Sequence, residues 1–137
     1  YLMQGLKMKM GSSKHAVILS GIMFGLMHIG NPEIEAIGSH VLIYYVVSGV
    51  FLGALALYDN GLELSIGYHA ANNIFAALMV SNDWQVFQTN ALYINTSPPD
   101  LGWMELLISL LFFPILFLIY KKIFKWTSLK ETWNHQD

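Results

Sequence analysis

The sequence predicts an all-α integral membrane helical bundle, with four transmembrane helices in one membrane domain that covers residues 1–137. First, 55% of the residues are hydrophobic and only 12% are charged, whereas a soluble domain carries about 25% charged residues. Second, hydropathy separates four apolar segments, and every lysine lies before the first segment or after the fourth. An apolar soluble core is the alternative, but it would have to hide four such helices with few polar residues to cover them.

The charge and the cysteine content exclude other classes of protein. Seven basic residues stand against nine acidic ones, for a net charge of −2, so we expect no nucleic-acid partner. The absence of cysteine excludes a disulfide scaffold and a thiol nucleophile. The chain begins at Tyr1 without a signal-peptide pattern, and we expect it to be a fragment of a longer protein.

The first two apolar segments differ in length. The first, Ala16 to Ile29, reaches the about 17–25 residues of a spanning helix only if it begins near Ser12, where Ser12 or Ser13 can serve as the N-cap. The sequence Gly-Asn-Pro-Glu at 30–33 then stops it, because proline cannot continue a helix. The second segment, Ile37 to Leu57, is the longest run without a charge and is a strong candidate to cross a bilayer.

The third and fourth segments complete the bundle. The third, Leu64 to Val80, follows an Asp-Asn-Gly sequence at 59–61, which is typical of a tight turn. The fourth, Trp103 to Tyr120, follows a longer loop over 81–101, whose aromatic residues suit a membrane interface.

The lysines test the count of four spans. No positive residue lies between Lys14 and Lys121, and an even number of spans places both ends of the chain on the face that the positive-inside rule makes cytoplasmic. We therefore expect a multi-pass protein of the cell membrane, with a fourth transmembrane helix over 102–120 and a cytoplasmic tail over 121–137. Three lysines are expected to anchor the end of that helix against anionic lipid: Lys121, Lys122 and Lys125.

Polar side chains inside the apolar segments are the candidates for function, because such groups are costly in a bilayer. His28 follows Phe24 by four residues, so both project from one helix face. His69 and Asn73 have the same spacing, with Asn72 on a neighbouring part of that face. Each pattern alone is equally well explained by hydrogen bonds between helices, but the two together on separate apolar segments favour a site.

The other polar residues are predicted to be structural. Three carboxylates near loops or helix ends are expected to be solvated: Glu33, Glu35 and Glu63. Three serines are expected to bond to backbone or across helices, which disfavours a serine hydrolase: Ser20, Ser48 and Ser65. Three further histidines lack a matching partner, and only the second is placed to line a cavity: His15, His40 and His135.

The segments Phe24-Gly-Leu-Met-His28 and His69-Ala-Ala-Asn-Asn73 resemble the second and third motifs of the CPBP family of CAAX proteases and bacteriocin-processing or immunity proteins. The resemblance covers about residues 1–80. The first motif of that family, Glu-Glu-x-x-x-Arg, is absent. Residues 1–6 resemble the stretch that follows it, so we expect the chain to be a C-terminal fragment that begins just after the motif.

The resemblance implies an intramembrane endopeptidase that uses an activated water to hydrolyse a peptide bond near the C-terminus of a lipidated or hydrophobic peptide. In such a protein, His28 helps a glutamate of the first motif to hold the water. His69 and Asn73 stabilise the oxyanion, a role that suits hydrogen-bond donors in a site of low dielectric constant. Phe24 orients the helix face that bears His28, and Asn72 supports the site.

Two alternatives stay open. No cofactor is expected, but zinc held by His28, His69 and an upstream glutamate is plausible ligand chemistry, as in a metalloendopeptidase. It ranks second because the sequence has no compact metal-binding spacing such as His-Glu-x-x-His. A non-catalytic or bacteriocin-immunity-type membrane protein that keeps the motifs for binding is the alternative function.

The positions of the two histidines along their helices conflict with a shared site. His28 lies about 21 Å along the axis from Lys14, and His69 only about 8 Å beyond Leu64, at about 1.5 Å per residue. The rings meet only if the first helix is tilted or begins outside the membrane. We expect a cavity that opens to the cytoplasm, with residues 31–35 near its floor.

Overall fold

The computed structural model describes residues 5–6, 8–9 and 11–126, and these are mostly helical. The helices are α2 (Ser13–Met27), α3 (Pro32–Ile37), α4 (Val41–Tyr58), α5 (Glu63–Met79) and α6 (Trp103–Ile123). Two-residue strands, β1 (Val80–Ser81) and β2 (Tyr93–Ile94), pair in parallel. The all-α prediction is thus correct apart from this short pair. Two of the lysines predicted to anchor the chain against lipid, Lys121 and Lys122, lie in the last turn of α6. Most of the predicted tail lies outside the described residues, as do Lys7, Lys130 and His135.

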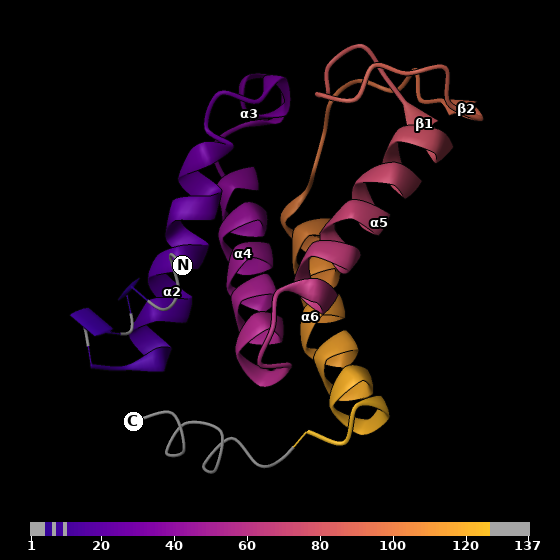
Figure 1. The fold of residues 1–137 in the computed structure, drawn as a ribbon. Coiled ribbons are helices and arrows are strands. Elements are labelled where there is room, and N and C mark those ends of the chain that lie inside the picture. Colours follow the sequence, from indigo (N-terminus) through magenta and orange to yellow (C-terminus); the bar gives the residue numbers. More distant parts are fainter. Residues whose placement is uncertain (1–4, 7, 10, 127–137) are drawn as a thin grey trace.

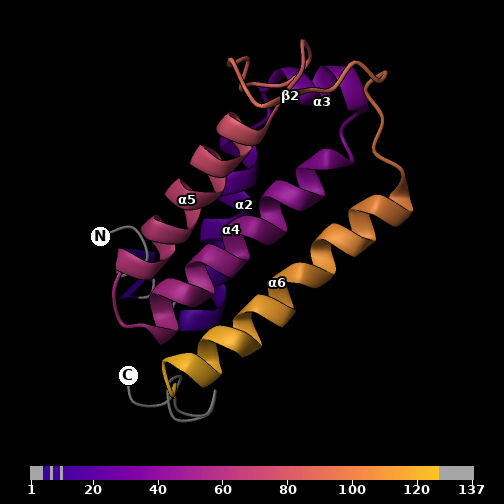
Figure 2. The ribbon, with the colours of Figure 1, turned by 90° about the vertical axis from the view of Figure 1, so that its right-hand side faces the viewer.

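The four long helices run along one another, and α3 lies with the β1–β2 loop at one end of the molecule (Figure 1, Figure 2). The start of α2, the α4–α5 turn and the end of α6 lie at the other end. Lys14 lies in the first turn of α2, and Lys121 lies in the last turn of α6. The lysines at both ends of the described chain therefore share one end of the bundle.

Among the described helices, two are long and apolar enough to cross a membrane, namely α4 and α6. The helices α2, with 15 residues, and α5, with 17, are shorter than α4 and α6 and are not among these candidate spans. The prediction of a helical protein is confirmed, and the described residues include two candidate membrane-spanning helices, whereas four spans are not confirmed.

The predicted boundary of the second helix is wrong at its start. Pro32 begins a separate short helix, α3, because its fixed φ angle suits the first turn of a helix and its missing N–H is not needed there. Gly38 then adopts a φ angle of +123°, which breaks the chain direction before α4 begins at Val41. The sequence at 30–33 stops the first helix as predicted, but the residues after it are helical again.

Glycines bring α2 and α4 into close contact. A Cβ atom on Gly21 would lie 2.4 Å from the side chain of Val50, and one on Gly25 equally close to Val46. On the facing helix, a Cβ atom on Gly49 would lie 2.7 Å from the Cβ atom of Phe24. Small residues allow such close helix packing inside a membrane, where dispersion contacts replace the hydrophobic driving force. This packing presses the face of α2 that carries Phe24 against the middle of α4.

The other face of α4 packs on α6 through a core cluster of Phe51, Leu55 and Phe113. The tight turn predicted at 59–61 joins α4 to α5, and Asn60 there has a φ angle of +53°, a left-handed conformation that asparagine tolerates. Because α4 contacts α2, α5 and α6, it is the central helix of the bundle.

Candidate functional site

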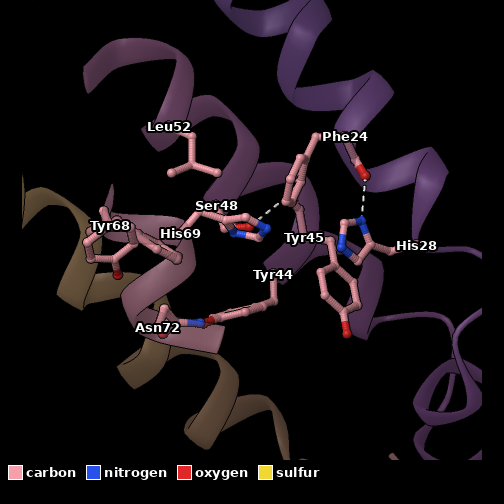
Figure 3. A pocket seen from close by; sticks show the side chains of 10 residues that line it. Phe24, His28, Tyr44, Tyr45, Ser48, Leu52, Tyr68, His69 and Asn72 are labelled. Carbon is pink, nitrogen blue, oxygen red and sulfur yellow. Dashed lines mark hydrogen bonds between the residues drawn. The ribbon is translucent and has the colours of Figure 1, made fainter. Parts of the chain in front are cut away.

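A cavity of about 40 Å³ lies between α2, α4 and α5, with one side chain from α6 on its wall. One water molecule needs about 10–15 Å³ by this measure, so about two to four fit. The polar residues around it are His28, Ser48, His69 and Asn72, and the others are Phe24, Tyr44, Tyr45, Leu52, Tyr68 and Phe113 (Figure 3). Three elements far apart in the sequence therefore contribute polar groups to one space large enough for a water reactant.

His28 lies directly after α2, as the residue that ends the helix. Its Nδ1 atom is 2.7 Å from the carbonyl oxygen of Phe24, and the dashed line that ends at the His28 ring in Figure 3 marks this bond. A carbonyl oxygen only accepts, so Nδ1 carries the proton, and in the neutral ring Nε2 keeps a free lone pair. The ring lies between two aromatic neighbours, with centroids 4.3 Å from Tyr45 and 4.5 Å from Phe24.

His69 and Asn73 contact each other, as their spacing predicts. The Asn73 amide nitrogen lies 3.3 Å from Nε2 of His69 and donates to it. The proton of the neutral His69 ring is then on Nδ1, which remains a hydrogen-bond donor. Both side chains are half-buried, and His69 lines the cavity whereas Asn73 holds its ring from the next turn of α5.

Phe24 resolves the conflict between the two histidine positions. Its ring meets His69 edge-on, with centroids 5.5 Å apart, and it lies one turn closer than His28 to the start of α2. Helix side chains point back toward the N-terminus, and the His28 ring folds back to the carbonyl of Phe24. The two histidines thus reach one cavity, with the Phe24 ring in contact with both.

All five predicted site residues lie at or next to this cavity, and the two asparagines are placed differently from each other. Asn72 lines the cavity, while Asn73 is held by His69. The sequence interpretation missed three tyrosines on the wall: Tyr44, Tyr45 and Tyr68. The sequence could have identified them, because each carries a hydroxyl group inside an apolar segment and Tyr68 directly precedes His69.

The prediction that Glu33 is a solvated carboxylate is wrong. Only 7% of its surface is exposed, and three hydrogen-bond donors take the place of water around its carboxylate. The hydroxyl of Tyr45 donates to Oε1, and the Asn31 amide donates to the same oxygen at 3.2 Å. The backbone N–H of Val86 donates to Oε2 at 3.1 Å. Glu35 and Glu63 are exposed, as predicted.

His40 does not line the cavity, contrary to the expectation. Its Nε2 atom donates to the carbonyl oxygen of Leu101 at 2.8 Å, and its ring lies against Trp103, so it ties the start of α4 to the start of α6. The three serines bond to main-chain carbonyl oxygens as predicted. These bonds join Ser20 to Val17, Ser48 to Tyr45 and Ser65 to Leu52.

Within the described residues there is no group of three histidine or acidic side chains that could hold a metal ion. The cavity offers two imidazoles, and one ring nitrogen of each is already engaged, by the Phe24 carbonyl and by the Asn73 amide. The arrangement suits a bound water between hydrogen-bonding groups.

Comparison with known proteins places these residues in a family context. The family model for type II CAAX prenyl endopeptidase Rce1-like proteins matches residues 1–75, a range that includes every predicted site residue. The uncharacterized protein YyaK of Bacillus subtilis (strain 168) is 29% identical over 70 residues, which are 51% of this chain and 23% of YyaK. The matched region is thus less than a quarter of that relative's length, and no solved structure matches.

Proposed function

Because the chain belongs to the Rce1-like family of type II CAAX prenyl endopeptidases, we propose that it acts as an intramembrane endopeptidase. Its substrate is a hydrophobic or lipidated peptide, cut near the C-terminus by an activated water. The observation that carries the proposal is that His28, at the end of α2, and His69, in α5, line one cavity large enough for water. Both histidines lie inside the range that the family model matches.

His28 holds the attacking water in this proposal. Its Nδ1 proton is committed to the Phe24 carbonyl, so Nε2 is the atom that accepts a hydrogen bond from water. A glutamate of the family's first motif supplies the general base. That motif does not occur in these 137 residues.

His69 and Asn73 stabilise the oxyanion that forms when water adds to the scissile carbonyl. His69 keeps its Nδ1 proton as a donor because Nε2 accepts from Asn73. The Asn73 amide has a second N–H, and Asn72 brings another amide to the cavity wall. Donors of this kind are each worth about 10²–10³ in kcat when they meet the developing charge.

The test uses the protein encoded by its full gene, purified in detergent, with a quenched fluorescent peptide that ends in a lipidated or hydrophobic segment. His69→Ala and Asn73→Ala should each lower kcat by about 10²-fold. His15→Ala and Asn90→Ala are matched controls at exposed positions and should cleave like the wild type.

Wild-type turnover in His69→Ala would contradict the oxyanion assignment. A wild-type protein that binds the peptide without cleaving it would favour the alternative function, a non-catalytic or immunity-type binding protein.

We also propose a multi-pass topology in the cell membrane with the lysine end of the bundle in the cytoplasm, which the positive-inside rule favours. These 137 residues contain no cysteine, so a cysteine introduced at one position is the single thiol in this part of the protein. In intact cells, an impermeant thiol reagent should label Asn90→Cys, in the loop between β1 and β2, but should label Lys122→Cys only after permeabilisation. The reverse pattern would contradict the orientation.

A further inference from the structure

Glu33 is the one buried carboxylate among the described residues, with 7% of its surface exposed. A buried charge is costly unless hydrogen bonds replace its water, and here the replacements come from three places. Asn31 precedes α3, Tyr45 belongs to α4, and Val86 lies in the loop after β1. Only a carboxylate accepts at both oxygens without offering a donor, so Glu33 fixes these three segments to one point.

Tyr45 connects this point to the cavity. Its hydroxyl is bound to Glu33, while its ring lines the cavity and lies on the His28 ring with an angle of 20° between their planes. The main chain of His28, at the end of α2, is held by two hydrogen bonds of 3.0 Å, from its N–H to the carbonyl of Gly25 and from the N–H of Asn31 to its own carbonyl, but neither of them fixes the side chain. The direction of the His28 ring therefore depends on its bond to the Phe24 carbonyl and on the two rings that enclose it.

We propose that Glu33 and Tyr45 form a positioning pair that holds His28 in the orientation needed for its part in catalysis. Glu33 is not itself the base. Its oxygens accept from three donors, and it does not line the cavity. It acts by fixing the Tyr45 hydroxyl, and thereby the ring that stacks on His28. The same carboxylate binds the N–H of Val86, so the loop after β1 also contributes to the order of the site.

This inference rests on the proposed function, and two variants test it in the protein encoded by its full gene. Tyr45→Phe removes one oxygen and keeps the stacked ring. Glu33→Gln keeps the side-chain volume, but its amide N–H₂ must face at least one of the three donors. Because small misplacements of a reacting group cost up to about 10²-fold, each variant should lower kcat about tenfold and change KM less than about threefold.

The double variant should lose no more than the worse single variant, because both substitutions break the same contact. Glu35→Gln and Tyr93→Phe are matched controls. Glu35 is exposed on the same helix, and Tyr93 is 65% exposed in β2. Both should keep wild-type kcat.

A second readout does not depend on cleavage. The ring of Tyr45 shifts the NMR signal of the His28 ring protons, which His28→Ala identifies by its loss. Glu33→Gln and Tyr45→Phe should move or broaden that signal, and Glu35→Gln should leave it in place. If Glu33→Gln does not fold, Tyr45→Phe decides the question alone.

The outcomes separate the two proposals. A wild-type protein that does not cleave the peptide would contradict the proposed function. In that case the NMR signal of the His28 ring still tests whether Glu33 and Tyr45 position that ring. An active wild type that depends on His69, with wild-type kcat and an unmoved His28 signal in Tyr45→Phe, overturns the positioning pair. A lowered melting temperature with unchanged kcat and signal would also overturn it.

Discussion

Replacing Gly49 by alanine tests how the α2–α4 contact builds the cavity. Gly49 faces α2, and the added Cβ atom would lie 2.7 Å from the Cβ atom of Phe24 and 3.0 Å from the Cα atom of Gly21. Carbon atoms in favourable contact are about 3.5–4.0 Å apart. Because one of the two contacts is with backbone, no side-chain rotation relieves it, and α2 must move away by about 1 Å.

The size of the effect follows from two opposing terms. Overpacking of this kind costs about 1–3 kcal/mol, while glycine to alanine in a helix gains about 1 kcal/mol in propensity. The net loss in the free energy of unfolding is thus about 0–2 kcal/mol. The displaced Phe24 also carries the carbonyl that orients His28, so under the proposed function cleavage should fall tenfold or more.

Gly67→Ala in α5 is the matched control, because a Cβ atom there meets nothing within 4 Å. It gains the same propensity without the clash, so it should exceed Gly49→Ala in stability by about 1–3 kcal/mol. Unfolding in detergent, followed by circular dichroism, measures this difference. Equal stabilities of the two alanine variants would refute the argument from helix contact.

The remaining predictions concern other contacts and the metal. His40→Ala removes the hydrogen bond to Leu101 and the contact with Trp103 and should lower the free energy of unfolding by about 0.5–1.5 kcal/mol; an unchanged melting curve would contradict a role in joining α4 to α6. Gly38→Ala forces a side chain into a φ angle of +123° and should cost more than about 1 kcal/mol, so a variant as stable as the wild type would show that the turn relaxes freely. A chelator should leave cleavage unchanged in the metal-free mechanism, whereas loss of cleavage that zinc restores would establish the metal-dependent alternative.

Local sequence features were sufficient for the order of the helices and for the pairs of residues on one helix face. The apolar runs, the proline at position 32 and the Asp-Asn-Gly turn predict the main elements to within a few residues. The spacing of His69 and Asn73 predicts their contact, because residues four apart on a helix are neighbours. The four-span prediction is not confirmed, since only α4 and α6 among the described helices are long and apolar enough to be candidate spans.

Local sequence features did not predict the contacts between segments that lie far apart in the chain. In the sequence, Glu33 looks like an exposed carboxylate in a loop. In the structure, it accepts a hydrogen bond from the N–H of Val86, which is 53 residues away. Likewise, the tyrosines of α4 and α5 resemble ordinary interfacial residues until the packing of the helices turns them toward one cavity.

The sequence by itself determined that this chain is helical and apolar and that it carries two family motifs, because those properties depend on neighbours within one or two turns. The tertiary structure decided which faces of the helices meet. The glycines let α2 approach α4, the Phe24 ring then reaches His69, and Tyr45 is placed between His28 and Glu33. Such contacts follow from close packing of whole helices, which no local pattern of residues specifies.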